Sequence, residues 1–244
     1  MRFAHPLIPA RLCKRYKRFL CDARLADGRQ VTAHCPNPGS MLSLLEADSE
    51  IWLAPAAGAK RKLPYSWELV RLKAALVGLN TGRANAVVAE ALAAGRVAEL
   101  AGYASLKREV PYGRNSRIDF LLEDPERPPC YLEVKSVTMS RRAGLAEFPD
   151  SVTARGAKHL DELAEMAAAG ARAVLFFLVQ RDDCRAVGLA GDIDPHYAER
   201  FENALTAGVE AISYCCKVST EGIELDRALP LGRPATPSTA TSQT

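Results

Sequence analysis

The second half of the chain alternates between the hydrophobic pattern of strands and that of helices. Short apolar runs end at turns such as 123–129, which is rich in proline and acidic residues. The fully apolar run Ala173–Val179 is typical of a strand buried on both faces. The order α-β-β-β-α-β, followed by a further helix and strand, predicts an α/β fold in which helices pack against a mixed sheet. The expected elements are helices at 85–97, 152–169 and 194–207 and strands at 106–111, 116–122, 130–137, 173–179 and 211–218.

The first 80 residues show short strands separated by turns. Asp27-Gly28 is a hairpin signal, and the prolines and glycine of 36–39 interrupt the chain. About five short strands in this space predict a small barrel of the oligonucleotide-binding (OB) type. The expected elements are strands at 19–25, 30–35, 50–54 and 67–72, a short helical piece at 41–45 and a basic loop at 60–62. The expected domains are 1–80, an OB-like nucleic-acid-binding domain, 81–230, a nuclease-like domain, and 231–244, a disordered tail rich in proline, serine and threonine.

Composition is that of an ordinary soluble globular protein. Hydrophobic residues make up 48% and charged residues 25% of the chain, and the longest apolar run is too short to cross a bilayer. The N-terminus lacks the apolar segment of a signal peptide. The seven cysteines include no Cys-x-x-Cys pair, which favours reduced thiols over a disulfide framework or a zinc site. We therefore expect a cytoplasmic protein with no membrane partner.

Positive charge is concentrated near the N-terminus. Residues 1–66 hold eleven Lys and Arg against five Asp and Glu, a balance of +6, so the rest of the chain carries −3 of the total of +3. The segment 11–18 is the most basic, and Tyr16 and Phe19 lie within or beside it. Cations interleaved with aromatic residues favour nucleic acid as a partner, although a strand edge protected by cations would show the same pattern. The candidate contacts here are Lys14, Arg15, Lys17 and Arg18.

Three residues on two expected strands form the candidate catalytic site. Asp119 is the carboxylate inside an otherwise apolar strand, where an unpaired charge would be very costly. Glu133 and Lys135, two residues apart on the next strand, point to one face. If the two strands form a hairpin, Asp119 can lie opposite Glu133, and a divalent cation would relieve the repulsion between their carboxylates.

A bound Mg²⁺ or Mn²⁺ would suit phosphodiester hydrolysis, with Asp119, Glu133 and Lys135 as catalytic residues and Asp119, Glu133 and Glu90 as metal ligands. Glu90 lies on the helix that precedes the strands, and Glu99 is the competing choice for that ligand. Lys135 would orient or deprotonate the attacking water and stabilise the developing charge. A simple ion pair along one strand is the alternative reading of Glu133 and Lys135.

The helix expected at 152–169 begins with a group of basic residues. Ser151 or Thr153 can cap its N-terminus. Arg155, Lys158 and His159 then stand at i, i+3 and i+4 on one face, where they could bind phosphate. A solvated helix face explains the same pattern equally well.

Four segments together resemble the sugar fermentation stimulation protein A (SfsA) family over about residues 5–230. The resemblance implies an OB barrel, a domain of the PD-(D/E)xK nuclease type, sequence-independent DNA binding in bacteria or archaea, and a genetic link to sugar (maltose) metabolism. Ile118 stands where the motif name has proline, and Pro38 follows Asn37 where the family more often has Asn-Thr-Gly. The segments are Ala33-His-Cys-Pro-Asn-Pro-Gly-Ser-Met41, Arg117-Ile-Asp-Phe-Leu121, Leu132-Glu-Val-Lys-Ser-Val137 and Phe148-Pro-Asp-Ser-Val-Thr-Ala-Arg-Gly-Ala-Lys-His-Leu160.

The resemblance carries roles to individual residues. Asp119 takes the place of the metal-binding aspartate, Glu133 that of the second acid and Lys135 that of the lysine, while Glu90 matches by its helical location. Two functions stay open: a Mg²⁺-dependent DNA nuclease, and a regulator of sugar-metabolism genes that binds DNA through a vestigial nuclease fold. A factor acting through a protein partner is a third, and a homodimer is compatible with each.

Overall fold

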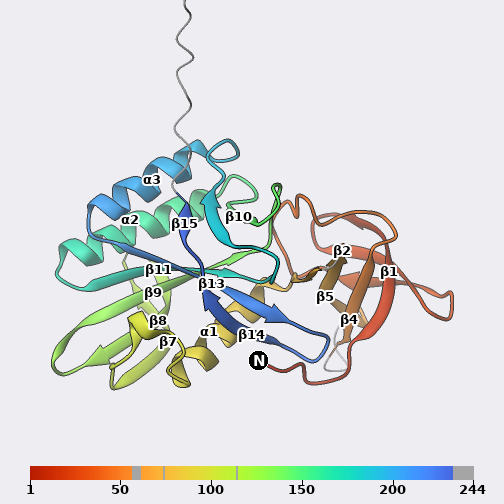
Figure 1. The fold of residues 1–244 in the computed structure, drawn as a ribbon, viewed down its shortest axis with the longest axis horizontal. Helices are drawn as coiled ribbons and strands as arrows, with labels where there is room; N and C mark the ends of the chain where they lie inside the picture. The colour runs from red at the N-terminus through yellow and green to blue at the C-terminus, as the bar shows by residue number, and fades with distance from the viewer. Residues whose placement is uncertain (57–61, 74, 114, 233–244) are drawn as a thin grey trace, which may run out of the picture.

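The computed structural model describes residues 1–56, 62–73, 75–113 and 115–232, which form an N-terminal β-barrel and a C-terminal α/β domain (Figure 1). The predicted fold class, an OB-like barrel followed by a mixed α/β domain, is confirmed. Most of the basic loop expected at 60–62 lies outside the described residues. No helix in the described ranges is long and apolar enough to span a membrane.

The barrel is a six-stranded sheet in the order β3-β2-β1-β4-β5-β6. A short parallel pairing of Ala33 with Tyr65 and of His34 with Ser66 joins β3 to β5 and closes the sheet on itself. Closure removes the free strand edges that an open sheet would expose. The strands are β1 (Ile8–Tyr16), β2 (Leu20–Leu25), β3 (Gln30–His34), β4 (Glu50–Pro55), β5 (Tyr65–Leu72) and β6 (Ala75–Gly78).

The barrel contains a strand, β1, that the expected elements left out and lacks one expected helical piece. The basic segment 11–18 is largely part of β1, in which buried Ala10 and Leu12 alternate with exposed neighbours. The helical piece expected at 41–45 is wrong, because Met41 and Ser43 have φ values of 57° and 71°, which an α-helix excludes. Buried Met41 and Leu44 instead insert into the barrel core from an irregular loop.

The C-terminal domain is built on a six-stranded mixed sheet in the order β14-β13-β11-β9-β8-β7. Its central strand β11 pairs in parallel with β9 and β13, so it is buried on both faces as its apolar sequence predicts. A second, three-stranded sheet has the order β10-β12-β15. The strands are β7 (Ser105–Tyr112), β8 (Ser116–Asp124), β9 (Arg127–Val137), β10 (Leu145–Phe148), β11 (Arg172–Val179), β12 (Ala186–Leu189), β13 (Glu210–Val218), β14 (Ile223–Ala228) and β15 (Leu231–Gly232).

Helices cover both faces of the larger sheet. Alternate residues of β11 separate the two cores: Phe176 faces the core that contains α1, and Phe177 faces the core beneath α2 and α3. Figure 1 shows α2 and α3 side by side along one face, with α1 on the other. Residues 231–232, where the disordered tail was expected to begin, form β15, and 233–244 lie outside the described residues. The helices are α1 (Ala84–Ala93), α2 (Ala154–Ala168) and α3 (Pro195–Thr206), with 3₁₀ turns at Thr81–Arg83 and Ala98–Leu100.

The barrel and the α/β domain are joined by shared packing as well as by the chain. Trp52 and Leu69 of the barrel belong to the same buried cluster as α1 and one face of the larger sheet. The Gly78 N–H donates to the Gln180 carbonyl at 2.8 Å, next to an isolated bridge between Val77 and Arg181. The barrel is therefore held against the end of β11, close to where the candidate site lies.

Candidate metal and nucleic-acid site

Asp119 on β8 and Glu133 on β9 meet where these two strands separate. The antiparallel pairing runs as far as Phe120 opposite Leu132, and the next step in the same register sets Asp119 against Glu133. The ladder between β8 and β9 stops there, so both carboxylates lie at the opening between the strands. The geometry expected from the hairpin is present.

The Asp119 carboxylate is held from two directions. One oxygen accepts a hydrogen bond from the Val134 N–H at 2.7 Å, in place of the missing ladder contact. The other accepts from the Asn85 side chain of α1 at 2.6 Å. Burial raises the pKa of Asp119 above its usual range, and the neighbouring charge of Glu133 raises it further. This carboxylate is therefore fixed in position and placed where a cation would stabilise its charge.

Glu133 forms a buried cluster with Lys135 and His159. The Lys135 ammonium lies 2.8 Å from Glu133 Oε1 and 3.3 Å from His159 Nδ1, and His159 Nδ1 also contacts Glu133 Oε1. Burial acts to raise the pKa of Glu133, but the Lys135 ammonium and the hydrogen bond from His159 outweigh it and hold the pKa below its usual range. Glu133 is thus an ionised carboxylate inside the protein.

The second carboxylate oxygen of Glu133, Oε2, is not satisfied by the part of the protein that the structure describes. Oε2 is buried and has no hydrogen-bond partner among the described residues. A buried carboxylate oxygen without a partner is costly unless a cation or an ordered water satisfies it. The donor set of two carboxylates fits a hard divalent cation that completes its coordination with main-chain carbonyl and water oxygens. Within the described ranges no three Asp, Glu, His or Cys side chains converge as a metal-binding group.

Glu90 does not supply the further ligand expected of α1. Its carboxylate pairs with the ammonium group of Met1 at 2.8 Å, and its side chain is half exposed. Asn85, five residues earlier, points to the site instead. Residues five apart on an α-helix are separated by about 140° around its axis, so Asn85 and Glu90 cannot face the same way. The competing residue, Glu99, accepts a hydrogen bond from the Tyr214 hydroxyl at 2.6 Å and also lies elsewhere.

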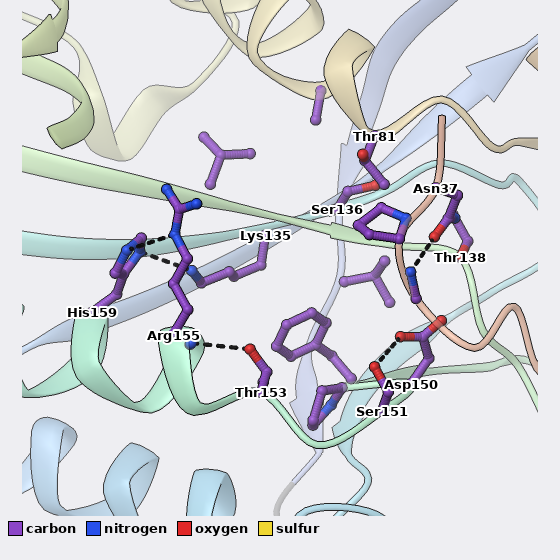
Figure 2. A pocket seen from close by; sticks show the side chains of 18 of the residues that line it. Asn37, Thr81, Lys135, Ser136, Thr138, Asp150, Ser151, Thr153, Arg155 and His159 are labelled. Carbon is purple, nitrogen blue, oxygen red and sulfur yellow. Dashed lines mark hydrogen bonds between the residues drawn. The ribbon is translucent and has the colours of Figure 1, made fainter. Parts of the chain in front are cut away.

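The three basic residues of α2 have different roles. Thr153 caps the helix by accepting from the Gly156 N–H at 3.0 Å. His159 is buried against the site rather than exposed to phosphate, while Arg155 lies at the pocket and donates to His159 Nε2 at 3.3 Å. Lys158 is exposed and contacts Ser116 and Glu162 outside the pocket. Figure 2 shows Arg155, His159 and Lys135 converging.

The cations of the barrel also differ in their surroundings. Lys14 lies 3.7 Å from Asp22 and over the Tyr16 ring. Lys17 and Arg18 form the exposed turn between β1 and β2, and Arg18 reaches the pocket. Arg15 is not free to bind phosphate as expected. Its guanidinium donates to the main-chain carbonyls of Asn37, Gly39, Ser40 and Arg18 at 2.8–3.1 Å.

The site opens into a cavity of about 870 Å³ between the two domains. Asn37, Pro38 and Gly39 of the barrel form one wall, and the ends of β9 and α2 form the other (Figure 2). Asp150, just before α2, accepts from the Met41 N–H at 3.0 Å and ties the walls together. The contributions of Asn37 and Asn85 carry no signal in hydrophobic periodicity, because polar residues at turns and helix starts are common for local reasons.

Arg15 is expected to stabilise the loop 37–40 that forms this wall. Arg15→Ala should lower the free energy of unfolding by about 1–3 kcal/mol, because hydrogen bonds from a charged donor to main-chain carbonyls are lost. Arg15→Lys should not restore the lost stability, since an ammonium group cannot donate several hydrogen bonds in the planar geometry of a guanidinium. Urea denaturation measures the change. Lys14→Ala, an exposed neighbour, is the control, and equal stabilities of the Arg15 and Lys14 variants would contradict this role.

Comparison with known protein families covers both domains. Residues 13–79 match the model described as the SfsA N-terminal OB domain, and residues 82–222 match the sugar fermentation stimulation protein RE domain. The chain belongs to the SfsA family. The structure accordingly combines an OB-like barrel with a restriction-endonuclease-like domain.

Sequence similarity to relatives extends over nearly the whole chain. The sugar fermentation stimulation protein homolog of Azorhizobium caulinodans is 55% identical over 235 residues, 95% of this chain and 99% of the relative. That of Rhodospirillum centenum is 56% identical over 231 residues, again 95% and 99%. The structure of Pyrococcus furiosus SfsA in complex with Ca²⁺ is similar with a TM-score of 0.85 and 26% identity, over 95% of this chain and 98% of that one.

Proposed function

We propose that this SfsA-family protein is a nucleic-acid-binding phosphodiesterase that uses a divalent cation, Mg²⁺ or Mn²⁺, and cleaves DNA without strong sequence preference. The observation that carries the proposal is that Asp119 and Lys135 lie beside Glu133, whose buried Oε2 has no hydrogen-bond partner among the described residues. The Ca²⁺ named with the Pyrococcus furiosus relative supports a divalent cation in this fold.

Asp119 and Glu133 would hold the cation, which when bound supplies positive charge to the scissile phosphate and acidifies water beside it. Asn85 and the Val134 N–H keep the Asp119 carboxylate in one orientation. Lys135, already pre-oriented by Glu133, would position the attacking water and stabilise the charge that develops on the phosphate. Arg155 would contact a neighbouring phosphate from the start of α2.

Lys135→Met tests this assignment. We expect cleavage of plasmid DNA in Mg²⁺ or Mn²⁺ to fall by at least about hundredfold, the cost typical of losing one preorganised charge-stabilising group. Lys107→Met is the matched control, because Lys107 is an exposed lysine that pairs with Glu123 and does not line the pocket. Indistinguishable product formation by the wild type and Lys135→Met would refute the catalytic role.

A DNA-binding regulator without turnover is the second candidate. It is favoured by the absence, within the described ranges, of a three-residue metal-ligating group. The relatives are named for stimulation of sugar fermentation. In that case the wild type would retard DNA in a gel with steep salt dependence and leave it intact with every divalent cation.

A further inference from the structure

Two exposed apolar residues belong to segments that border the interdomain cavity. Val152 lines the cavity at the start of α2 and is 76% exposed. Phe19 directly follows Arg18, which also lines the cavity, and is 44% exposed. The Phe19 ring stacks on His34, with centroids 6.3 Å apart and planes inclined by 26°. Exposed aromatic and aliphatic groups at the edge of a polar cavity are suited to contact a flat apolar surface.

Cations line the same cavity. Arg18 comes from the barrel, Arg108 from β7 and Arg155 from α2. In the described part of the chain none of these three guanidinium groups has an ion-pair partner, although Arg108 lies over the Phe120 ring. Three guanidinium groups without an ion-pair partner in the described residues therefore line the same cavity as Lys135.

Most acids that line the cavity are held by partners or lie at the candidate metal site; the exception is Glu109, an exposed residue next to Arg108 that accepts a long hydrogen bond from the Asn85 side chain at 3.4 Å. Glu147 is buried and paired with Arg141 and Arg142, and the Asp150 carboxylate accepts a hydrogen bond from the Met41 N–H of the barrel loop. Asp119 and Glu133 lie at the inner end, where they form the site described above.

We propose that this cavity binds single-stranded nucleic acid, with unpaired bases against Phe19 and Val152 and the backbone along Arg18, Arg108 and Arg155. A duplex would present sugars and phosphates, not base faces, to the two apolar side chains. A stacking side chain on an OB-type barrel beside basic residues is the combination that binds single strands without sequence preference. The inference rests on the proposed function, because it gives that site its substrate: a single strand or the unpaired end of a duplex.

Binding measured without cleavage tests the inference. Fluorescein-labelled oligodeoxythymidylate and a labelled duplex would be titrated with the full-length protein in EDTA, and fluorescence anisotropy followed. We expect Phe19→Ala to weaken oligodeoxythymidylate binding roughly tenfold or more, with a smaller loss for Val152→Ala. Duplex binding should change less than twofold, and Phe19→Tyr should retain the wild-type affinity for the single strand.

Leu205→Ala is the matched control, because Leu205 is an exposed apolar residue on α3 with 38% exposure. Unchanged single-strand affinity in Phe19→Ala and Val152→Ala, or an equal loss for duplex and single strand, would overturn the inference. If these variants lose single-strand binding while the wild type cleaves nothing in any divalent cation, the binding surface stands and the nuclease proposal fails. If cleavage persists unaltered in both variants along with binding, the surface assignment alone fails.

Discussion

Glu133→Gln is expected to abolish uptake of a divalent cation at the site. Glutamine has nearly the same shape, but it removes the charge on the carboxylate whose Oε2 has no partner among the described residues. Changes to groups that merely orient a metal ligand cost about 10–100-fold in metal affinity, so loss of a direct ligand should cost more than about hundredfold. Isothermal titration with Mn²⁺ would measure the loss, and DNA cleavage should fall in parallel.

The control for this substitution is Glu123→Gln. Glu123 lies on β8 as Asp119 does, but near its far end, where it pairs with Lys107. Because Glu133→Gln also leaves Lys135 and His159 without a charged partner, Asp119→Asn serves as a second variant, and circular dichroism checks that both fold. Wild-type Mn²⁺ uptake in both folded variants would show that these carboxylates are not the ligands.

Leu69→Ala is expected to destabilise the whole molecule, not the barrel alone. Leu69 is fully buried in the cluster that joins the barrel to α1 and the larger sheet. A buried leucine replaced by alanine costs about 2–5 kcal/mol, since apolar contacts are lost and a cavity is left. The two tryptophans, Trp52 and Trp67, both lie in the barrel, whereas α1, α2 and α3 belong to the other domain.

Tryptophan fluorescence and circular dichroism at the helix wavelength therefore report on different domains. Urea unfolding should give coincident transitions by both probes in the wild type, and Leu69→Ala should move both by the same amount. Leu205→Ala, an exposed change on α3, should shift neither transition by more than about 0.5 kcal/mol. A shift confined to the fluorescence transition would show that the domains unfold independently.

The core of the candidate site follows from local sequence pattern. A strand repeats every two residues, so Glu133 and Lys135 had to share a face, and a hairpin register could set Asp119 opposite Glu133. The apolar run of β11 likewise indicated a strand buried on both faces. These inferences succeed because side chains alternate between the two faces along each strand. Hydrogen bonds between paired strands align these faces, so opposite residues share a face.

The residues that complete the site depend on contacts between distant segments. Glu90 and Asn85 are both polar residues of one helix, and the way α1 packs decides which of them reaches Asp119. His159 lies at the border between the apolar and polar faces of α2, so its burial depends on the charged cluster that receives it. Arg15 reads as an exposed cation until the loop 37–40 folds over it.

The sequence by itself determined the two-domain α/β architecture and the Asp119–Glu133–Lys135 set, because hydrophobic periodicity and strand register are local properties. Only the tertiary structure decided which polar groups of α1 and α2 turn inward, which barrel cations stay available, and that Arg18 and Val152 line one cavity. The physical reason is that a polar side chain can be satisfied by water as well as by the protein, so its sequence position alone does not say which partner it has.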